Sequence, residues 1–206
     1  FTLVGGGLLV SVLLWVKGVY APLDALRYGM FNLVSIATTT GYATVDYLSW
    51  PVFAPVFMLL LSGVATSAGS TGCGIKMVRM LILLKQARRE MNRLVHPRAV
   101  QPVRLGDAVV DNRVIFSVLA FMLVYGATII GLSMVLLLTD LDPVTAFSAV
   151  IASVNCMGPG LGSVGPASNY AVLTDFQVWV CTLAMLLGRL EILSFMALLT
   201  PAFWRR

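Results

Sequence analysis

The sequence predicts an all-α integral membrane protein that contains two tandem repeats of helix, re-entrant pore loop and helix. The 206 residues are 59% hydrophobic and 11% charged, with a mean hydropathy of +0.92, whereas soluble domains are about half apolar and a quarter charged. Four apolar stretches, at 1–20, 51–86, 113–138 and 173–203, are long enough for a bilayer core, which needs ~20 residues. Between them lie two glycine-bearing strips that each follow a short helical pattern.

The first repeat is expected over residues 1–95. Residues 1–20 form its first helix, and Pro22 separates them from a short helix whose apolar residues recur at helical spacing as far as Ala37. At ~1.5 Å per residue this second helix is too short to cross the membrane, so we expect it to enter and return, with pore helix and strip together covering 23–44. Bare backbone at such depth survives only when it is buried in protein or lines a water-filled cavity.

The remaining helix of this repeat, at 51–95, is expected to be interrupted at residues 63–74. That segment consists almost wholly of small or hydroxylic residues. About 12 helical residues precede it, which reach ~18 Å into a core roughly 30 Å thick. Since discontinuous helices commonly mark transport sites, we expect an unwound segment that lines a cavity. Close helix packing through small residues is the alternative explanation.

The second repeat is expected over residues 113–206, after a cytoplasmic loop at 96–112. A helix at 113–138 precedes a pore helix and strip at 143–162, and an unbroken helix at 173–203 closes the unit. Aligning Gly41 with Gly158 places Thr38 on Asn155 within similar helical patterns, and this internal repetition indicates two units around one axis.

One arginine, Arg189, falls near the centre of the closing helix. An arginine at such a position costs about 2.5–3.5 kcal/mol on insertion scales. Glu191, two residues away, lies on a different helix face, so we expect Arg189 to face a pore, where its charge would oppose cations. A buried arginine that binds backbone carbonyls of the broken helix is the other interpretation.

The charges predict the orientation. Nine of the fourteen Lys and Arg residues lie between Lys76 and Arg113, which places the 85–112 loop and the C-terminus in the cytoplasm. A basic run directly after a membrane helix favours lipid headgroups or a docked cytoplasmic partner over nucleic acid. Five acidic residues fall on the opposite side, where they concentrate cations or are simply tolerated: Asp24, Asp46, Asp140, Asp142 and Asp175. The three cysteines are too few for a disulfide framework or metal cluster.

Several motifs in the chain resemble the TrkH/TrkG family of potassium-uptake proteins, in the superfamily that also contains KtrB. Residues 38–46 and 68–76 resemble the third pore repeat of that family, and residues 155–162 and 188–191 resemble the fourth. Further similarity at 94–100 and 199–204 extends the likeness over essentially the whole chain. Family members fold as four covalently linked repeats around one pore, so this chain is expected to be the C-terminal half of a longer protein. The segment Gly63–Gly69 departs from the family pattern, which has a glycine pair and a cysteine there.

The resemblance implies potassium ion uptake, passive or by symport, through a multi-pass homodimer in the bacterial inner membrane. It implies no enzymatic activity and no covalently bound cofactor, since K⁺ (or Rb⁺) is the permeating ion. A TrkA-like cytosolic regulatory subunit that binds NAD(H) or ATP would dock on the inner face. The resemblance implies that backbone carbonyls line the filter, at Thr39, Thr40, Gly41, Asn155, Cys156, Met157 and Gly158. It also implies a gate formed by Arg189 with Gly63, Gly69, Ser70, Thr71, Gly72 and Gly74.

Two other functions fit the sequence less well. A tandem-pore potassium channel also carries two pore loops per chain, but its filters read Gly-Tyr-Gly, whereas this chain has Gly41-Tyr42-Ala43 and Gly158-Pro159-Gly160. An intramembrane hydrolase could use Ser70 as its nucleophile, but the sequence places no histidine or aspartate pair at membrane depth to activate it.

Overall fold

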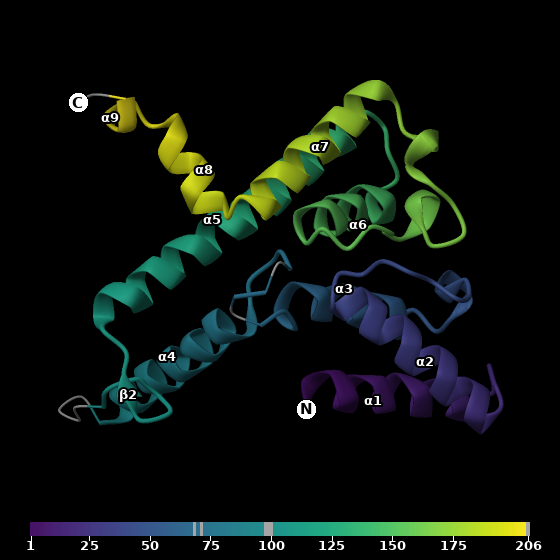
Figure 1. Cartoon of the computed structure of the whole chain (residues 1–206), viewed down its shortest axis with the longest axis horizontal. Helices are drawn as coiled ribbons and strands as arrows, with labels where there is room; N and C mark the ends of the chain where they lie inside the picture. The colour runs from purple at the N-terminus through teal and green to yellow at the C-terminus, as the bar shows by residue number, and fades with distance from the viewer. Residues whose placement is uncertain (68, 71, 97–100, 205–206) are drawn as a thin grey trace.

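The computed structural model describes residues 1–67, 69–70, 72–96 and 101–204. In this part of the chain the fold is helical, apart from one small antiparallel hairpin of β1 (Arg104–Leu105) and β2 (Ala108–Val109). The predicted helical fold class is confirmed. Figure 1 shows the helices arranged as an open assembly, with the N-terminal helices on one side of α6 and the C-terminal helices on the other.

The first repeat begins with α1 (Thr2–Val16) and α2 (Pro22–Ala37), which pack against each other. Pro22 occupies the first turn of α2, where a missing N–H costs nothing, and Asp24 lies at the positive end of the helix dipole. The short 3₁₀ turn η1 (Tyr47–Ser49) then leads to α3 (Phe53–Val64), and α4 (Met77–Val95) resumes the helical path after a gap. Residues 65–76 thus separate the two helices, two residues later than the expected break at 63–74.

The second repeat starts with α5 (Asn112–Leu137) and the short helix α6 (Pro143–Val154). The Asp142 carboxylate caps α6 by accepting the Thr145 amide at 3.1 Å. The 3₁₀ turns η2 (Gly162–Val164) and η3 (Tyr170–Val172) follow, and Thr174 with Gln177 forms a capping box at the start of α7 (Asp175–Arg189). The chain ends with α8 (Ile192–Leu199) and α9 (Pro201–Trp204).

The prediction of one unbroken helix at 173–203 is wrong. The structure divides this segment at Leu190 and Glu191, where Glu191 has a φ of +53°. A left-handed residue cannot continue a right-handed helix. The carboxylate of Glu191 is instead held by two cations from the first repeat, Lys76 at 2.8 Å and Arg79 at 3.1 Å. These partners are remote in sequence, so helical periodicity carried no sign of the break.

Among the described residues, α5 is the helix that is both long and apolar enough to cross a membrane, with 26 residues and a mean hydropathy of 2.3. Three shorter apolar helices, α1, α3 and α6, have 15, 12 and 12 residues. Two of the four long apolar stretches seen in the sequence are therefore not single helices: 51–86 is divided between α3 and α4, and 173–203 is divided between α7, α8 and α9. The outer face of α5 exposes large apolar side chains at Phe116, Leu123 and Ile130, as expected for a helix that contacts lipid or other apolar helices.

Each repeat has its own apolar core, and the second strip joins them. One cluster is formed by α5 to α8, and the other by α1 to α3. Ala152, Met157 and Leu161 of the second repeat belong to the core of the first. Met157 is 2% exposed. The second strip is therefore fixed between the two repeats.

Candidate functional site

Two irregular strips follow the short helices α2 and α6, and their backbones are bonded alike. We call residues 38–43 the first strip and residues 155–162 the second strip. In the first strip, the amide of Thr39 donates to the Ile36 carbonyl at 3.1 Å, and that of Thr40 to the Ser35 carbonyl at 2.8 Å. In the second, the amide of Cys156 donates to the Ser153 carbonyl at 3.1 Å, and that of Met157 to the Ala152 carbonyl at 3.0 Å. Every one of these pairs is related by the same offset of 117 residues that aligns Gly41 with Gly158.

The φ angles repeat in the same way. Thr39 and Gly41 have φ of +59° and +83°, and Cys156 and Gly158 have +55° and +96°. The residue between each pair is on the ordinary side of the φ axis. Because residues of positive and negative φ alternate, neither strip can continue as a regular helix or strand. A left-handed threonine and a left-handed cysteine are uncommon, which marks both strips as functional candidates.

The two strips lie side by side. A Cβ atom placed on Gly41 would lie 2.5 Å from the Met157 carbonyl oxygen, and one placed on Gly158 would lie 3.8 Å from the Gly41 Cα. Glycine is required at position 41 both by its positive φ and by this close approach. The glycines that the alignment pairs are thus neighbours in space as well.

Buried polar side chains of the short helices bind the chain near the end of each strip, at Thr44 just after the first strip and at Leu161 in the second strip. Asn32, fully buried in α2, donates to the Thr44 hydroxyl at 3.0 Å and accepts the Thr44 amide at 3.2 Å. Ser148, on α6, accepts the Leu161 amide at 2.8 Å and donates to its carbonyl at 3.1 Å. Thr44 and Leu161 are again equivalent under the 117-residue offset. The same structural task is therefore met by different side chains.

A further contact reaches the second strip from η3. The Tyr170 hydroxyl donates to the Gly158 carbonyl at 3.0 Å. Burial raises the pKa of Tyr170, so this phenol stays protonated and remains a donor at physiological pH. Tyr170 therefore orients the carbonyl of the glycine on which the strip turns.

Tyr170→Phe is expected to lower the preference for Rb⁺ over Na⁺ by about two- to tenfold, because it removes one net hydrogen bond of ~0.5–1.5 kcal/mol from the strip. The measurement is competitive Rb⁺ uptake by the full-length parent protein. Tyr42→Phe is the matched control, because Tyr42 is a 72% exposed tyrosine within the first strip. Equal behaviour of the two variants would contradict the role of the Tyr170 contact.

The segment between α3 and α4 forms a closed loop inside the fold. Its two ends are joined by the Ile75 amide, which donates to the Gly63 carbonyl at 2.7 Å, and by the Met77 amide, which donates to the Thr66 carbonyl at 2.8 Å. Gly74, at φ +95°, passes so close to Gly63 that a Cβ there would lie 2.9 Å from the Gly63 oxygen. We call residues 65–76 the intramembrane loop; this segment begins and ends two residues later than the intramembrane loop expected at 63–74.

Asn155 connects the second strip to this loop. Its side chain is 1% exposed, accepts from the Tyr125 hydroxyl at 2.7 Å and donates to the Ser62 hydroxyl at 3.0 Å. Its oxygen would also lie 3.1 Å from a Cβ on Gly74. One amide thus holds α5, the end of α3, the intramembrane loop and the second strip together.

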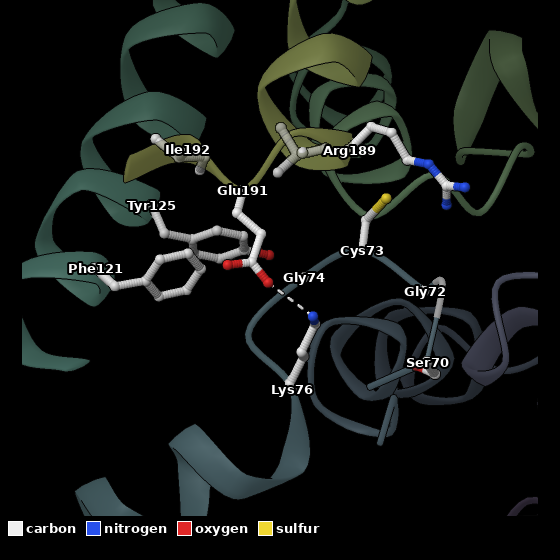
Figure 2. A pocket seen from close by; sticks show the side chains of 12 residues that line it. Ser70, Gly72, Cys73, Gly74, Lys76, Phe121, Tyr125, Arg189, Glu191 and Ile192 are labelled. Carbon is white, nitrogen blue, oxygen red and sulfur yellow. Dashed lines mark hydrogen bonds and ion pairs between the residues drawn. The ribbon is translucent and has the colours of Figure 1, made fainter. Parts of the chain in front are cut away.

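The intramembrane loop, α5 and the α7–α8 break enclose a cavity of about 140 Å³. Figure 2 shows Lys76 reaching Glu191 across this cavity, with Cys73 and Arg189 on its other side. Arg79, which shares Glu191 with Lys76, also lies 4.1 Å above the Phe121 ring. The charges that line the cavity thus lie where the gap between α3 and α4 meets the break between α7 and α8.

The structure brings most of the expected gate residues together. Arg189, Ser70, Gly72 and Gly74 line the cavity, and a Cβ on Gly72 would lie 3.5 Å from the Thr39 hydroxyl of the first strip. Gly63 lies behind the cavity wall, where it adjoins Gly74 and Asn155. Of the other two expected residues, Gly69 is not part of the cavity lining and has open space where a Cβ would lie, and Thr71 lies outside the described residues.

Sequence reasoning missed four residues that shape this site: Asn32, Tyr125, Ser148 and Tyr170. Asn32 and Ser148 are polar positions within otherwise apolar short helices, and that signal was available. The role of Asn155 also differs from the expectation in part, because its side chain makes the contacts described above. Tyr125 and Tyr170 have no such signal, since their partners lie 30 and 12 residues away.

The fold and the paired strips define a membrane protein of the pore-loop class, built from repeats of helix, re-entrant helix and strip. Residues 16–205 match the family model of TrkH, a cation transport protein. The chain therefore belongs to the TrkH family, and the resemblance seen in its motifs is confirmed.

Individual relatives support this membership. The Trk system potassium uptake protein TrkH of Vibrio parahaemolyticus is 43% identical over 185 residues, which cover 90% of this chain and 38% of that protein. The TrkH and TrkG proteins of Escherichia coli are 38% and 39% identical, and each alignment covers 100% of this chain and 42% of the relative. The crystal structure of the V. parahaemolyticus potassium transporter TrkH has a TM-score of 0.92 at 41% identity, over 100% of this chain and 44% of that one. The chain spans about two fifths of the length of the relatives it matches.

Proposed function

We propose that this chain forms half of the K⁺ pathway of a TrkH-type potassium-uptake protein. The observation that carries the proposal is the pair of equivalent strips, which share backbone bonds and φ signs and lie in contact at Gly41 and Met157. The names of the relatives, which are potassium uptake proteins, support the choice of ion.

The two strips supply half of a carbonyl ring for the ion. K⁺ gives up its water to such rings of backbone oxygens, and the chemistry depends on carbonyl position rather than on side-chain type. This explains why a threonine strip and a strip of cysteine and methionine serve the same purpose. The assigned carbonyls belong to Thr39, Thr40 and Gly41 in the first strip and to Asn155, Cys156, Met157 and Gly158 in the second.

The intramembrane loop is the gate beneath this ring. Gly72 adjoins Thr39, and Gly74 adjoins Asn155, so the loop contacts both strips. Its lower end is fastened to the α7–α8 break by the Lys76–Glu191 ion pair at 2.8 Å. Arg189, on the wall of the same cavity, adds a positive charge that opposes a cation leaving the ring.

Arg189→Ala is expected to raise Rb⁺ flux, because a barrier lower by ~1 kcal/mol increases a rate about fivefold. The measurement is Rb⁺ uptake per molecule of full-length protein in membrane vesicles. Arg189→Lys keeps the charge and should stay near the wild-type flux. If the lysine and alanine variants are equally fast, the charge is not the barrier.

We extend the proposal to the inner face and its partners. The C-terminal half of α4 is basic, and Lys85, Arg88, Arg89 and Arg104 surround a hollow of about 340 Å³ with the following loop. Basic residues next to a membrane helix indicate the cytoplasmic side of a bacterial inner membrane, so this surface is available to a TrkA-like, NAD(H)- or ATP-binding subunit. Assembly as a homodimer is carried over from the family resemblance.

The test is Rb⁺ uptake by bacteria that lack their own potassium-uptake systems and express the full-length parent protein. Uptake by the wild type and a reduced preference for Rb⁺ over Na⁺ in Gly158→Ser would support the carbonyl ring. Membrane-inserted protein that takes up no Rb⁺, even with a TrkA-like subunit coexpressed, would contradict the function.

A further inference from the structure

Two of the three cysteines meet between the intramembrane loop and the second strip. The Cys73 and Cys156 thiols lie close enough to influence each other electrostatically, and the Cys156 thiol also lies 4.0 Å from the Val154 and Met185 carbonyl oxygens. Cys73 belongs to the loop and is buried, and Cys156 is the left-handed residue of the second strip and is partly exposed. Both are free thiols.

The surrounding backbone brings these thiols together independently. Gly74, directly after Cys73, adjoins the side chain of Asn155, directly before Cys156. Asn155 is itself fixed by Tyr125 and Ser62, and Gly74 by its contact with Gly63. The two cysteines are therefore held on segments that have little freedom to separate while the loop is in this position.

The setting of Cys73 is that of a reactive cysteine. Its side chain lines the 140 Å³ cavity, which has room for several waters or for a small peroxide. The positive charge of Arg189 lies near the Cys73 thiol, and Figure 2 shows these two side chains on neighbouring segments of the cavity wall. A cation near a thiol, with a second thiol close by, is the arrangement found at redox-sensitive cysteines.

We propose that Cys73 and Cys156 are a redox-modifiable pair, which a peroxide converts into a disulfide between the intramembrane loop and the second strip. The Cys73 sulfur attacks one peroxide oxygen, the O–O bond breaks, and a sulfenic acid and one water form. The Cys156 thiol then displaces the sulfenic oxygen as a second water. Two thiols and one hydrogen peroxide thus give one disulfide and two waters.

A metal site is the less fitting use of these thiols. Within the described residues no third histidine, cysteine, aspartate or glutamate joins them in a group that could hold a metal ion, and the adjacent guanidinium repels cations. Cys181 is buried on α7 and offers an internal control.

The disulfide would hold the gate against the ring of carbonyls. This consequence rests on the proposed function, in which the loop moves relative to the strips when ions pass. Oxidation is therefore expected to lower flux, and a phosphine that reduces the disulfide should restore it.

The chemical test treats the full-length protein in membrane vesicles with hydrogen peroxide, followed by alkylation and trypsin. No Lys or Arg interrupts residues 28–76, which contain Cys73 alone, or residues 114–189, which contain Cys156 and Cys181. A disulfide between these two peptides is expected in the wild type and in Cys181→Ser, and is expected to be lost in Cys73→Ser and Cys156→Ser. Fragmentation of the wild-type pair identifies the linked cysteine even where a variant fails to fold. No linked pair, or a link to Cys181, would overturn the proposal.

The functional test compares Rb⁺ flux before and after peroxide within each variant. We expect a reversible fall of about fivefold or more, equivalent to a barrier higher by ~1 kcal/mol, in the wild type and in Cys181→Ser, and none in the two variants that lack the pair. A complete disulfide with unchanged flux would overturn the link to gating. A wild type that transports no Rb⁺ before oxidation would refute the proposed function instead, and the peptide measurement would still decide the thiol pair.

Discussion

Gly41→Ser is expected to remove most of the preference for Rb⁺ over Na⁺. The new Cβ would lie 2.5 Å from the Met157 carbonyl oxygen, so the substitution displaces a ring oxygen of the other repeat as well as straining its own strip. Strain alone costs about 1–2 kcal/mol, because L-residues are disfavoured in the left-handed region. Since each 1.4 kcal/mol is a factor of ten, we expect the Rb⁺/Na⁺ uptake ratio to fall by about tenfold or more.

Two glycine variants calibrate this result. Gly158→Ser has the strain of φ +96° but meets only the Gly41 Cα, at 3.8 Å, so its effect should be smaller. Gly131→Ser, in a part of α5 with open space around the glycine, should leave the uptake ratio unchanged. A Gly41→Ser protein with the ratio of Gly131→Ser would refute the contact between the strips as a determinant of selectivity.

Asn155→Leu is expected to have the second largest effect. Leucine has a similar size but leaves the Tyr125 and Ser62 hydroxyls without their amide partner in a buried place, and each unsatisfied group costs ~1–3 kcal/mol. We expect a lower unfolding temperature in detergent together with altered Rb⁺ flux, since the same amide joins the loop to the strip.

The double variant Tyr125→Phe/Asn155→Leu separates the hydrogen bond from simple packing. Replacing both partners by apolar groups can be nearly neutral, so the double variant should be more stable than Asn155→Leu alone. Tyr125→Phe by itself is the reference for losing only the phenol. Stability losses that simply add would show that the two side chains do not act together.

Local pattern was sufficient to predict the parts of this fold that depend on neighbours in sequence. The short helices before the strips, the interruption after Val64 and the equivalence of Gly41 with Gly158 all follow from spacing and composition. The α7–α8 break did not, because it depends on Lys76 and Arg79, which lie more than 110 residues from Glu191. The proximity of Cys73 and Cys156 was not anticipated for a similar reason, because the two residues belong to different repeats. Tyr170 was not anticipated because its contact with Gly158 spans 12 residues, which is beyond helical or strand spacing.

The positions of the strips could also be predicted from the sequence, but the hydrogen-bond partners of their side chains could not. Asn155 aligns with Thr38, whose hydroxyl donates to the Val34 carbonyl within its own repeat at 2.7 Å. The alignment therefore predicted a common backbone conformation at this position. It did not predict the hydrogen bonds that Asn155 makes with Tyr125 and Ser62. At this position the backbones of the two repeats are equivalent but the side chains differ: Thr38 binds within its own repeat, whereas Asn155 also binds the other repeat.

The order in which the chain is synthesised has a consequence for the intramembrane loop. Its partners Asn155 and Glu191 lie up to 115 residues further along the chain, and translation proceeds at ~5–20 residues per second. The loop therefore spends on the order of 10 s in the nascent chain without its amide anchor and without its carboxylate. During that interval Lys76 and Arg79 lack Glu191, the acidic residue between α7 and α8 that binds them in the finished fold. Two cations therefore have to be kept in a polar environment until that residue has been synthesised.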